Sequence, residues 1–412
     1  MVHGDRANKC LSARWLSATR CTALRALLMF SATYLAVSAV AAQEALKIGV
    51  LLPTTGVFAP IGKEQLNGMQ IAVDEAGGSA GGRKIQLLVE DTEAKPDVGL
   101  NKARKLVISD RIDAVAGIVS SAVALAVAPY TSSQKVPLVI SNAGTNLLSG
   151  EKCNRFIFRA AYSSAQIGAP MGTWLAKQGV KRIFVMASDF VTPHEFVDAF
   201  KEAYQKGGGT VVGEAFPPFN KTQDYSPYIS QARAANPDGV FAIFYGGEAV
   251  LFTRQYESFG MKKTIPLYSS MGLVPAMLHG AQGDAALDVA ASVNYVPELD
   301  NPDNKKFVAA YKAKFGGVPA EFAVMGYDAV RFIIEAVKAR GGDTKDRDAL
   351  VGALEKVSYN GPRGPMAVEV GNRGARQNVY IAKTIKTADG IGYQVLETLP
   401  DMPDPVKGCR LQ

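Results

Sequence analysis

The chain has 412 residues, of which 45 are Lys or Arg and 38 are Asp or Glu, so its formal net charge is +7. Residues 1–42 hold five of the basic residues and one Asp, which leaves a net charge of +3 on the remainder. A net charge of +3 on a chain of this length gives no reason to expect nucleic-acid binding. After residue 42 no segment is long and apolar enough to span a bilayer, which argues against an integral membrane protein.

The first 42 residues have the pattern of a secretory signal peptide. A basic opening leads into the apolar run 26–37, and the small residues SAVAAQ at 38–43 are typical of a cleavage site. The apolar run is too short, and too soon followed by that site, to favour a membrane anchor. No Leu-x-x-Cys arrangement indicates lipid attachment. We therefore expect a soluble protein that is exported to the periplasm.

Four cysteines are present, and two of them, Cys10 and Cys21, lie within the expected signal peptide. Cys153 and Cys409 remain, in a compartment that permits disulfides. One pair allows one connectivity, so we expect a bond that ties the C-terminal tail to the middle of the chain. Two unpaired thiols are the alternative.

Strands and helices alternate from residue 46 onward. The pattern predicts strands at 46–52, 85–89, 114–118 and 137–140, and helices at 62–76, 96–109 and 122–133. Runs of β-branched residues separated by amphipathic helices indicate a parallel sheet covered on both faces.

The same alternation then starts again. The pattern predicts strands at 182–186, 210–214 and 239–245, and helices at 195–206, 225–235 and 248–259, followed by the segment 265–268. The pattern then predicts two helices, at 305–315 and 323–340, that resemble those of the first half. It also predicts two strands in the C-terminal segment, at 378–385 and 391–399.

About 370 residues exceed what one hydrophobic core usually serves, so we expect an α/β fold of two similar, doubly wound lobes with a ligand cleft between them. Three crossing segments would join the lobes. The predicted boundaries are 43–160 and 298–372 for lobe 1, and 161–297 and 373–412 for lobe 2.

The stretch LVISNAGT, residues 138–145, ends a buried strand in small polar residues. In an open parallel sheet such an end points into the crevice at the carboxyl edge, where its N–H groups and hydroxyls could bind a ligand. For the stretch alone, an ordinary exit from strand to loop is the alternative.

Three segments carry a resemblance to a known family: LKIGVLLPTTGVFAPIGKEQLNGMQIAVDEAGG, GGRKIQLLVEDTEAKPDVGLNKARKLV and ISNAGTNLL. They resemble the periplasmic substrate-binding proteins of ABC importers, and more narrowly the leucine/isoleucine/valine-binding family, over residues 46–370. Smaller shared features are Gly62 with Gly68, the Gly81-Gly82 turn, Asp91-Thr92 and Phe158-Arg159. The resemblance implies the two-lobe type I fold of periplasmic binding proteins.

Family members hold an amino acid's carboxylate with a Ser after the third strand, and with N–H groups and a Thr after the fourth. The matching positions here are Ser120 or Ser121, and Ala143 with Thr145. The two serines also stand where a helix begins near residue 122, and a helix N-terminus favours negative charge. Plain helix capping is the alternative role for these serines.

The chain departs from the family in the loop 269–275. Relatives that bind amino acids place a carboxylate from the second lobe against the ligand's ammonium, whereas here Leu273 and Val274 follow Gly272. The Tyr-Gly pair often found near residues 193–194 is also missing. The pocket, with Gly272 in its wall, is therefore expected to hold a carboxylate joined to an apolar body.

Four aromatic residues are expected near the cleft, where their rings could stack on a flat ligand: Phe58, Tyr162, Phe190 and Tyr245. Ordinary core packing is the alternative for each. The predicted ligand is an aromatic carboxylate of benzoate or phenylpropenoate type. A branched-chain amino acid is the rival, in which case Asp189 or Glu248 could supply the missing negative charge.

Other functional classes find little support. No Gly-x-Ser-x-Gly follows a strand, His194 and His279 lack metal-ligand spacing, and residues 77–84 lack the Gly-Lys-Ser/Thr of a phosphate loop. We expect no enzyme, cofactor or metal site. The expected partners are the small carboxylate and the ABC permease subunits of the inner membrane, with the protein a monomer that binds no nucleic acid. A periplasmic sensor that docks on a signalling receptor is a further alternative.

Overall fold

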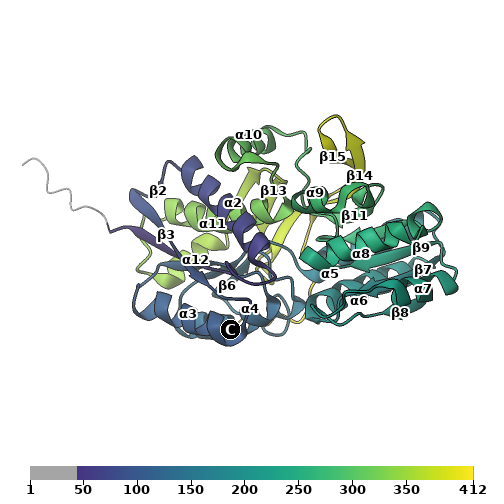
Figure 1. Ribbon diagram of the computed structural model, residues 1–412. Helices are drawn as coiled ribbons and strands as arrows, with labels where there is room; N and C mark the ends of the chain where they lie inside the picture. The colour runs from purple at the N-terminus through teal and green to yellow at the C-terminus, as the bar shows by residue number, and fades with distance from the viewer. Residues whose placement is uncertain (1–43, 412) are drawn as a thin grey trace, which may run out of the picture. The chain divides into compact units, whose positions relative to one another are not determined.

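The computed structural model describes residues 44–411, and its two sheets contain all the strands of that part of the chain (Figure 1). The expected signal peptide, with Cys10 and Cys21, lies outside the described residues. Among the residues that are described, none of the helices has the length and apolar character needed to cross a membrane.

The first sheet has six strands in the order β2-β3-β1-β4-β5-β6. Every pairing along it is parallel except that of β2 with β3. The strands are β1 (Leu46–Leu52), β2 (Ser79–Ala80), β3 (Arg83–Asp91), β4 (Ala114–Gly117), β5 (Leu138–Ile140) and β6 (Ile157–Arg159). The helices between them are α2 (Ala59–Glu75), α3 (Pro96–Ile108) and α4 (Ser121–Ser133).

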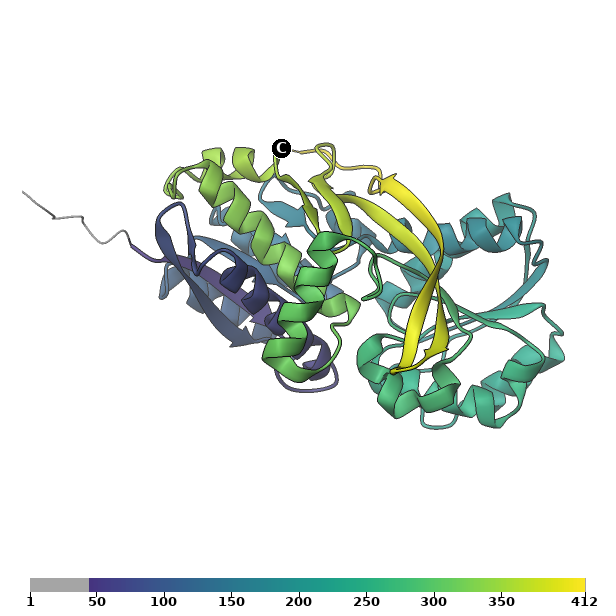
Figure 2. The same ribbon diagram turned by 90° about the horizontal axis from the view of Figure 1, so that it is seen from above.

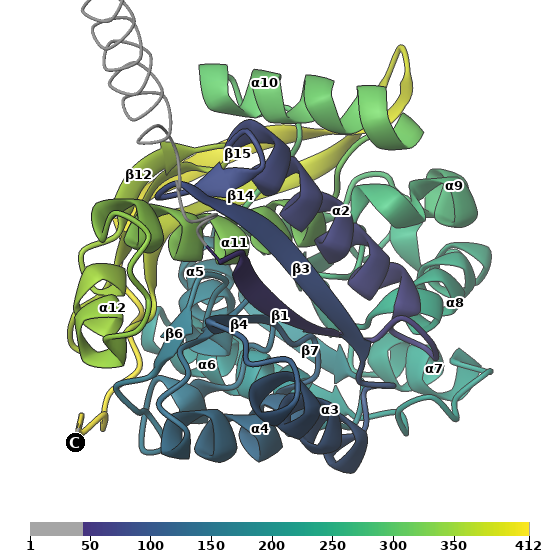
Figure 3. The same cartoon turned by 90° about the vertical axis from the view of Figure 1, so that its left-hand side faces the viewer.

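Helix α11 (Glu321–Ala339), from late in the chain, packs along α2 of this first lobe (Figure 3). Two glycines make the close approach possible. A Cβ on Gly68 would stand 1.7 Å from the carbonyl oxygen of Ala323, and one on Gly326 would stand 2.1 Å from that of Gln65. A Cβ on Gly62 would likewise meet the Pro53 carbonyl at 2.0 Å. The Gly62 and Gly68 pair of the family resemblance thus has a packing reason.

The second sheet has nine strands in the order β12-β13-β14-β11-β10-β9-β7-β8, with β15 paired to β14. Strands β7 to β11 are parallel, and β12 to β15 pair antiparallel. The two long strands β14 and β15 run together in Figure 2 (yellow). The strands are β7 (Arg182–Ala187), β8 (Thr210–Ala215), β9 (Gly239–Ile243), β10 (Leu267–Ser270), β11 (Ala290–Val293), β12 (Ser358–Gly361), β13 (Gly364–Val368), β14 (Ala375–Thr387) and β15 (Gly390–Met402).

The helices of the second half begin with α5 and α6, which pack against each other. The predicted helix at 195–206 starts four residues too late, because α6 already begins at Val191 and Pro193 is tolerated in a first helical turn. The helices are α5 (Ser164–Lys177), α6 (Val191–Lys206), α7 (Ser226–Ala234), α8 (Gly246–Ser258), α9 (His279–Gln282), α10 (Pro302–Tyr311) and α12 (Arg347–Leu354).

The crossing segment after β6 is held by a buried ion pair. Arg363 and Asp328 are both fully buried, with Nε and Oδ2 2.6 Å apart. The Arg363 guanidinium also donates to the carbonyl oxygens of Ala160 and Ala161, and Gln377 Nε2 donates to Ala161 at 2.7 Å. Strands β12 and β13 join the second sheet although they lie within the 298–372 range expected for lobe 1. The exact lobe boundaries stay a prediction.

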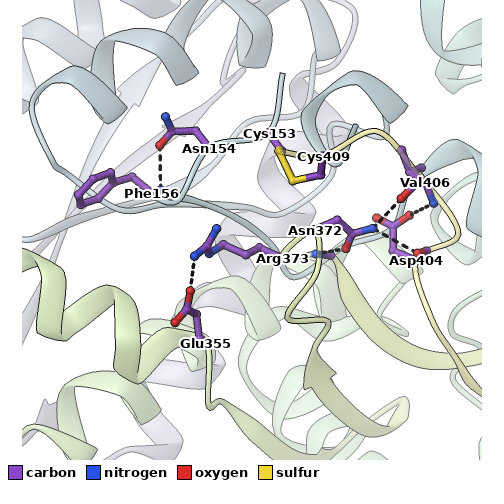
Figure 4. Close-up of a disulfide and its surroundings, with 10 residues drawn as sticks. Cys153, Asn154, Phe156, Glu355, Asn372, Arg373, Asp404, Val406 and Cys409 are labelled. Atoms are coloured by element: carbon purple, nitrogen blue, oxygen red, sulfur yellow. Dashed lines mark hydrogen bonds and ion pairs between the residues drawn. A yellow bond between two sulfur atoms is a disulfide. The ribbon is translucent and has the colours of Figure 1, made fainter. Parts of the chain in front are cut away.

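The expected disulfide is confirmed: Cys153 is bonded to Cys409 across 256 residues of sequence (Figure 4). Hydrogen bonds hold the tail beside it, because Asn372 Nδ2 donates to the carbonyl oxygens of Asp404 and Val406 at 3.2 and 3.1 Å. Ser163 Oγ, at the start of α5, donates to Asp404 Oδ1 at 2.7 Å.

Replacing both cysteines by serine should lower the free energy of unfolding. In the chain-entropy model, a cross-link that closes so long a loop stabilises by up to about 5 kcal/mol. Thermal unfolding of the Cys153→Ser/Cys409→Ser variant, followed by circular dichroism, measures this loss. A melting temperature equal to that of the unreduced parent would contradict it.

Candidate functional site

One cavity of about 350 Å³ lies between elements of the two sheets. That volume is within the usual range for small-molecule sites. Its wall is formed by Val57, Phe58, Ile61, Glu93, Ala94, Val119, Ser120, Ser121, Ala122, Asn142, Gly144, Tyr162, Phe190, Val191, Thr192, Phe219, Tyr245 and Phe322.

Four helix N-termini meet at this cavity. Phe58, Ser120, Phe190 and Tyr245 are the N-cap residues of α2, α4, α6 and α8, and all four line the wall. None of these four side chains makes a capping hydrogen bond. The first-turn N–H groups of a helix have no partner within the helix, and its dipole is positive at that end. The cavity is therefore suited to an anion even though no cationic side chain is among its described lining residues.

An aromatic cluster covers much of the remaining wall. The ring of Phe219 is stacked on Phe58, with centroids 5.8 Å apart, and lies 4.5 Å from the ring of Phe190. Phe190 in turn lies 6.1 Å from Tyr245. Because these rings come from the ends of different helices and loops, they offer a flat apolar ligand several faces.

The structure brings six of the nine predicted ligand-binding residues to the cavity wall: Phe58, Ser120, Ser121, Tyr162, Phe190 and Tyr245. The alternative of simple capping does not hold for Ser120, whose hydroxyl makes no capping bond. Sequence reasoning did not identify Phe219, which follows β8 in the segment FPPFN. Phe219 could have been predicted from its position, because it follows the carboxyl end of a parallel strand, where ligands bind in open α/β sheets.

The other three predicted residues do not reach the wall. The amide of Ala143 donates to the carbonyl oxygen of Ile118 at 3.0 Å, so it has no free N–H group to offer. The hydroxyl of Thr145 donates to Glu195 Oε1 at 2.8 Å. Gly272 lies behind the wall, against the ring of Tyr245.

Several hydrogen bonds join the first lobe to α6 next to the cavity. Ser121 Oγ and Thr192 Oγ1 lie 3.0 Å apart; within the first lobe, the Thr145 amide donates to the same Ser121 Oγ at 3.3 Å. Glu195 also accepts a bond from the Asn146 amide at 3.0 Å. Burial raises the pKa of the Glu195 carboxyl, while the bonds from Thr145 and Asn146 lower it. These contacts hold one side of the cavity closed.

The two acids expected as alternative partners for an ammonium are engaged elsewhere. Asp189 is exposed and lies 2.9 Å from His194 Nε2. Glu248 is buried and accepts hydrogen bonds from the Ser188 hydroxyl and the Asn220 amide. Glu93 is the one carboxylate among the described lining residues, and it pairs at 2.8 Å with Lys95 in an exposed position.

Gly272 supports the wall from outside. Its φ is +99°, and a Cβ there would stand 2.3 Å from Cδ1 and Cε1 of the Tyr245 ring. Only glycine satisfies both the backbone conformation and this close approach. Gly272 is thus a positioning residue for Tyr245 rather than a direct contact of the cavity.

Gly272→Ala should therefore lower the free energy of unfolding by about 1–3 kcal/mol, the usual cost of a strained backbone conformation. Urea unfolding measures the change. The matched control is Gly280→Ala in α9, where a Cβ meets nothing within 4 Å. Equal stability of the two variants would contradict the positioning role.

Comparisons with known proteins agree with this geometry. Residues 45–390 match the family model described as periplasmic binding protein. The Leu/Ile/Val-binding protein homolog 6 of Brucella melitensis biotype 1 is 30% identical over 390 residues, covering 93% of this chain and 98% of that protein.

Two solved structures are also similar. A solute-binding protein of an ABC transporter from R. palustris, in complex with benzoate, is 30% identical, has a TM-score of 0.83, and covers 89% of this chain and 100% of its own. A solute-binding protein from Rhodopseudomonas palustris BisB5, in complex with 3,4-dihydroxybenzoic acid, is 32% identical with a TM-score of 0.83, covering 88% and 99%. With its two-lobe α/β fold, this chain belongs to the periplasmic binding protein family.

Proposed function

We propose that the protein captures a small aromatic carboxylate outside the cytoplasm and delivers it to the permease of an ABC importer. The observation that carries the proposal is the convergence of four uncapped helix N-termini on a cavity lined mainly by aromatic and aliphatic side chains. The N-termini favour an anion, and the rings favour a flat apolar body. The bound benzoates of the two similar solved structures support the same ligand class.

The carboxylate would bind at the start of α4. Ser120 and Ser121 line the cavity there together with Ala122, and first-turn amides can donate charge-assisted hydrogen bonds to both carboxylate oxygens. The ring of the ligand would lie between Phe58, Phe190 and Tyr245. On this placement no ammonium is needed, which agrees with the absence of a buried carboxylate among the described lining residues.

Closure of the lobes would trap the ligand, because the wall takes residues from both sheets. Shifting the closed state from 1:99 to 99:1 requires a differential binding free energy of about 5.5 kcal/mol. Two or three charge-assisted hydrogen bonds, each worth about 1.5–3 kcal/mol, together with buried ring surface, can supply that. The closed surface would then be what the permease recognises, with the protein acting as a monomer.

An amino-acid ligand is the second candidate, and the naming of the Brucella relative favours it. It would require Glu93 to leave Lys95 and neutralise the ammonium, or the ammonium to stay at the open rim of the cavity. Desolvating an unpaired ammonium costs several kcal/mol.

A ligand panel separates the two candidates. Benzoate and 4-hydroxybenzoate should raise the melting temperature of the protein, whereas leucine, isoleucine and valine should leave it unchanged. Thermal shift followed by calorimetric titration measures both groups. Stabilisation by the branched-chain amino acids alone would overturn the aromatic assignment.

Removing the two hydroxyls at α4 should weaken binding without unfolding the protein. Ser120→Ala/Ser121→Ala should bind benzoate at least tenfold more weakly, since a hydrogen bond to a charged group is worth about 1.5–3 kcal/mol. The control is Ser133→Ala at the other end of α4, whose hydroxyl donates to Tyr130 O on the surface. Affinities equal to the parent in both variants, by calorimetry, would place the carboxylate elsewhere.

A further inference from the structure

A buried carboxyl group lies behind the cavity wall, at the contact between the lobes. Glu321 is the first residue of α11, and only 5% of its surface is exposed. Its neighbour Phe322 lines the cavity, while Glu321 itself faces a small adjoining space with Gly272, Tyr295 and Tyr393. Because Gly272 lines the same small space, its amide lies close enough to favour the charged form of the Glu321 carboxyl.

This contact crosses between the lobes. Helix α11 packs on α2 in the first lobe, whereas Gly272 follows β10 of the second sheet. Gly272 presses on the ring of Tyr245, which lines the cavity. Glu321 therefore lies beside the backbone that positions this part of the wall.

The surroundings of Glu321 penalise its negative charge. Burial is the main cause that raises the pKa of its carboxyl to about 7; the nearby Glu64 carboxyl also acts to raise it, and the Glu321 and Gly272 amides act to lower it. Glu64, on α2, is held by Tyr311 Oη at 2.7 Å and by the Ala320 amide at 3.3 Å.

The phenol and imidazole groups around this contact are neutral near pH 7. Tyr162, Tyr245 and Tyr393 lie near enough to interact with the charge of Glu321, and burial raises the pKa of each phenol. His279 contacts Val274 O in the same loop, and burial lowers the pKa of its ring. The groups that can change their charge at this contact are thus Glu321, whose pKa is about 7, and the buried carboxyls of Glu64 and Glu298, whose pKa values burial also raises.

We propose that Glu321 is a positioning residue that couples closure of the cavity to the uptake of one proton. The proposal rests on ligand capture by lobe closure as set out above. When the lobes separate, the Glu321 carboxyl moves away from Gly272 and becomes hydrated. When they close, the carboxyl is buried beside Glu64 and takes a proton from solvent. A neutral Glu321 also removes a negative charge from behind a cavity that holds an anion.

The sign of the pH effect follows from the two states. In the open state the pKa of a hydrated Glu carboxyl is near its ordinary value of 4.5, and in the closed state burial raises it to about 7. The closed state therefore holds more protons between these two values, so closure is favoured at the acidic end and the advantage is lost as the pH rises through 7. Benzoate should bind about tenfold more tightly at pH 6 than at pH 8.

Calorimetric titration with benzoate at pH 6, in two buffers of different ionisation enthalpy, measures the number of protons taken up. The parent protein should take up about one proton per benzoate bound. Glu321→Gln should take up none and should bind with little dependence on pH. Glu64→Gln should shift the midpoint of the pH dependence downward, because it removes the carboxylate that repels Glu321.

The matched control is Glu335→Gln on the same helix. This substitution removes an ion pair with Arg331 away from the cavity, and it should leave proton uptake unchanged. If Glu321→Gln does not fold, the parent still tests the proposal, since infrared difference spectra at pH 6 should show a protonated carboxyl appearing with benzoate. Binding without proton uptake overturns the role of Glu321 and leaves the proposed function intact. Uptake that persists in Glu321→Gln also overturns it, and failure of the parent to bind any aromatic acid overturns the proposed function instead.

Discussion

An anion can occupy an apolar cavity only if hydrogen-bond donors replace the water that it loses, and the proposed capture of an aromatic carboxylate depends on that constraint. Parallel strands place the N-termini of their following helices at the same edge of a sheet. Here α2 and α4 belong to one sheet and α6 and α8 to the other, and all four begin at one cavity. Donors therefore come from the backbone, which leaves the side chains free to supply aromatic surface.

The polar groups near the cavity serve two tasks. Some face the space where a ligand fits, as Ser120 does, and others hold the lobes together, as Thr145 does through Glu195. Ser121 does both, because it lines the cavity and lies within hydrogen-bonding distance of Thr192. A carboxylate at the start of α4 would compete with or extend that bond, which is a direct physical link between ligand binding and lobe contact.

Close packing also connects the contact between the lobes to the opposite side of the cavity. Gly68 and Gly326 let α11 lie directly on α2, which sets the position of its first residue, Glu321. Glu321 lines the same small space as Gly272, and Gly272 supports Tyr245. Because Gly68, Gly326 and Gly272 each leave no room for an added Cβ, a substitution at any of them would displace its packed neighbours.

The sequence alone determined the alternation of strands and helices, the two-lobe fold, the disulfide and six residues of the cavity wall. Local patterns are enough for these predictions, because apolar periodicity, strand ends and helix starts depend on residues that are neighbours in the sequence. It did not reveal that Ala143 and Thr145 already have partners, that Phe219 joins the wall, or that Glu321 lies behind it. Those facts depend on contacts between residues far apart in the sequence, 25 positions for Ala143 with Ile118 and 50 for Thr145 with Glu195. Only the tertiary structure decides them, because whether a polar group is free or engaged is a property of the packed neighbourhood and not of the segment that contains it.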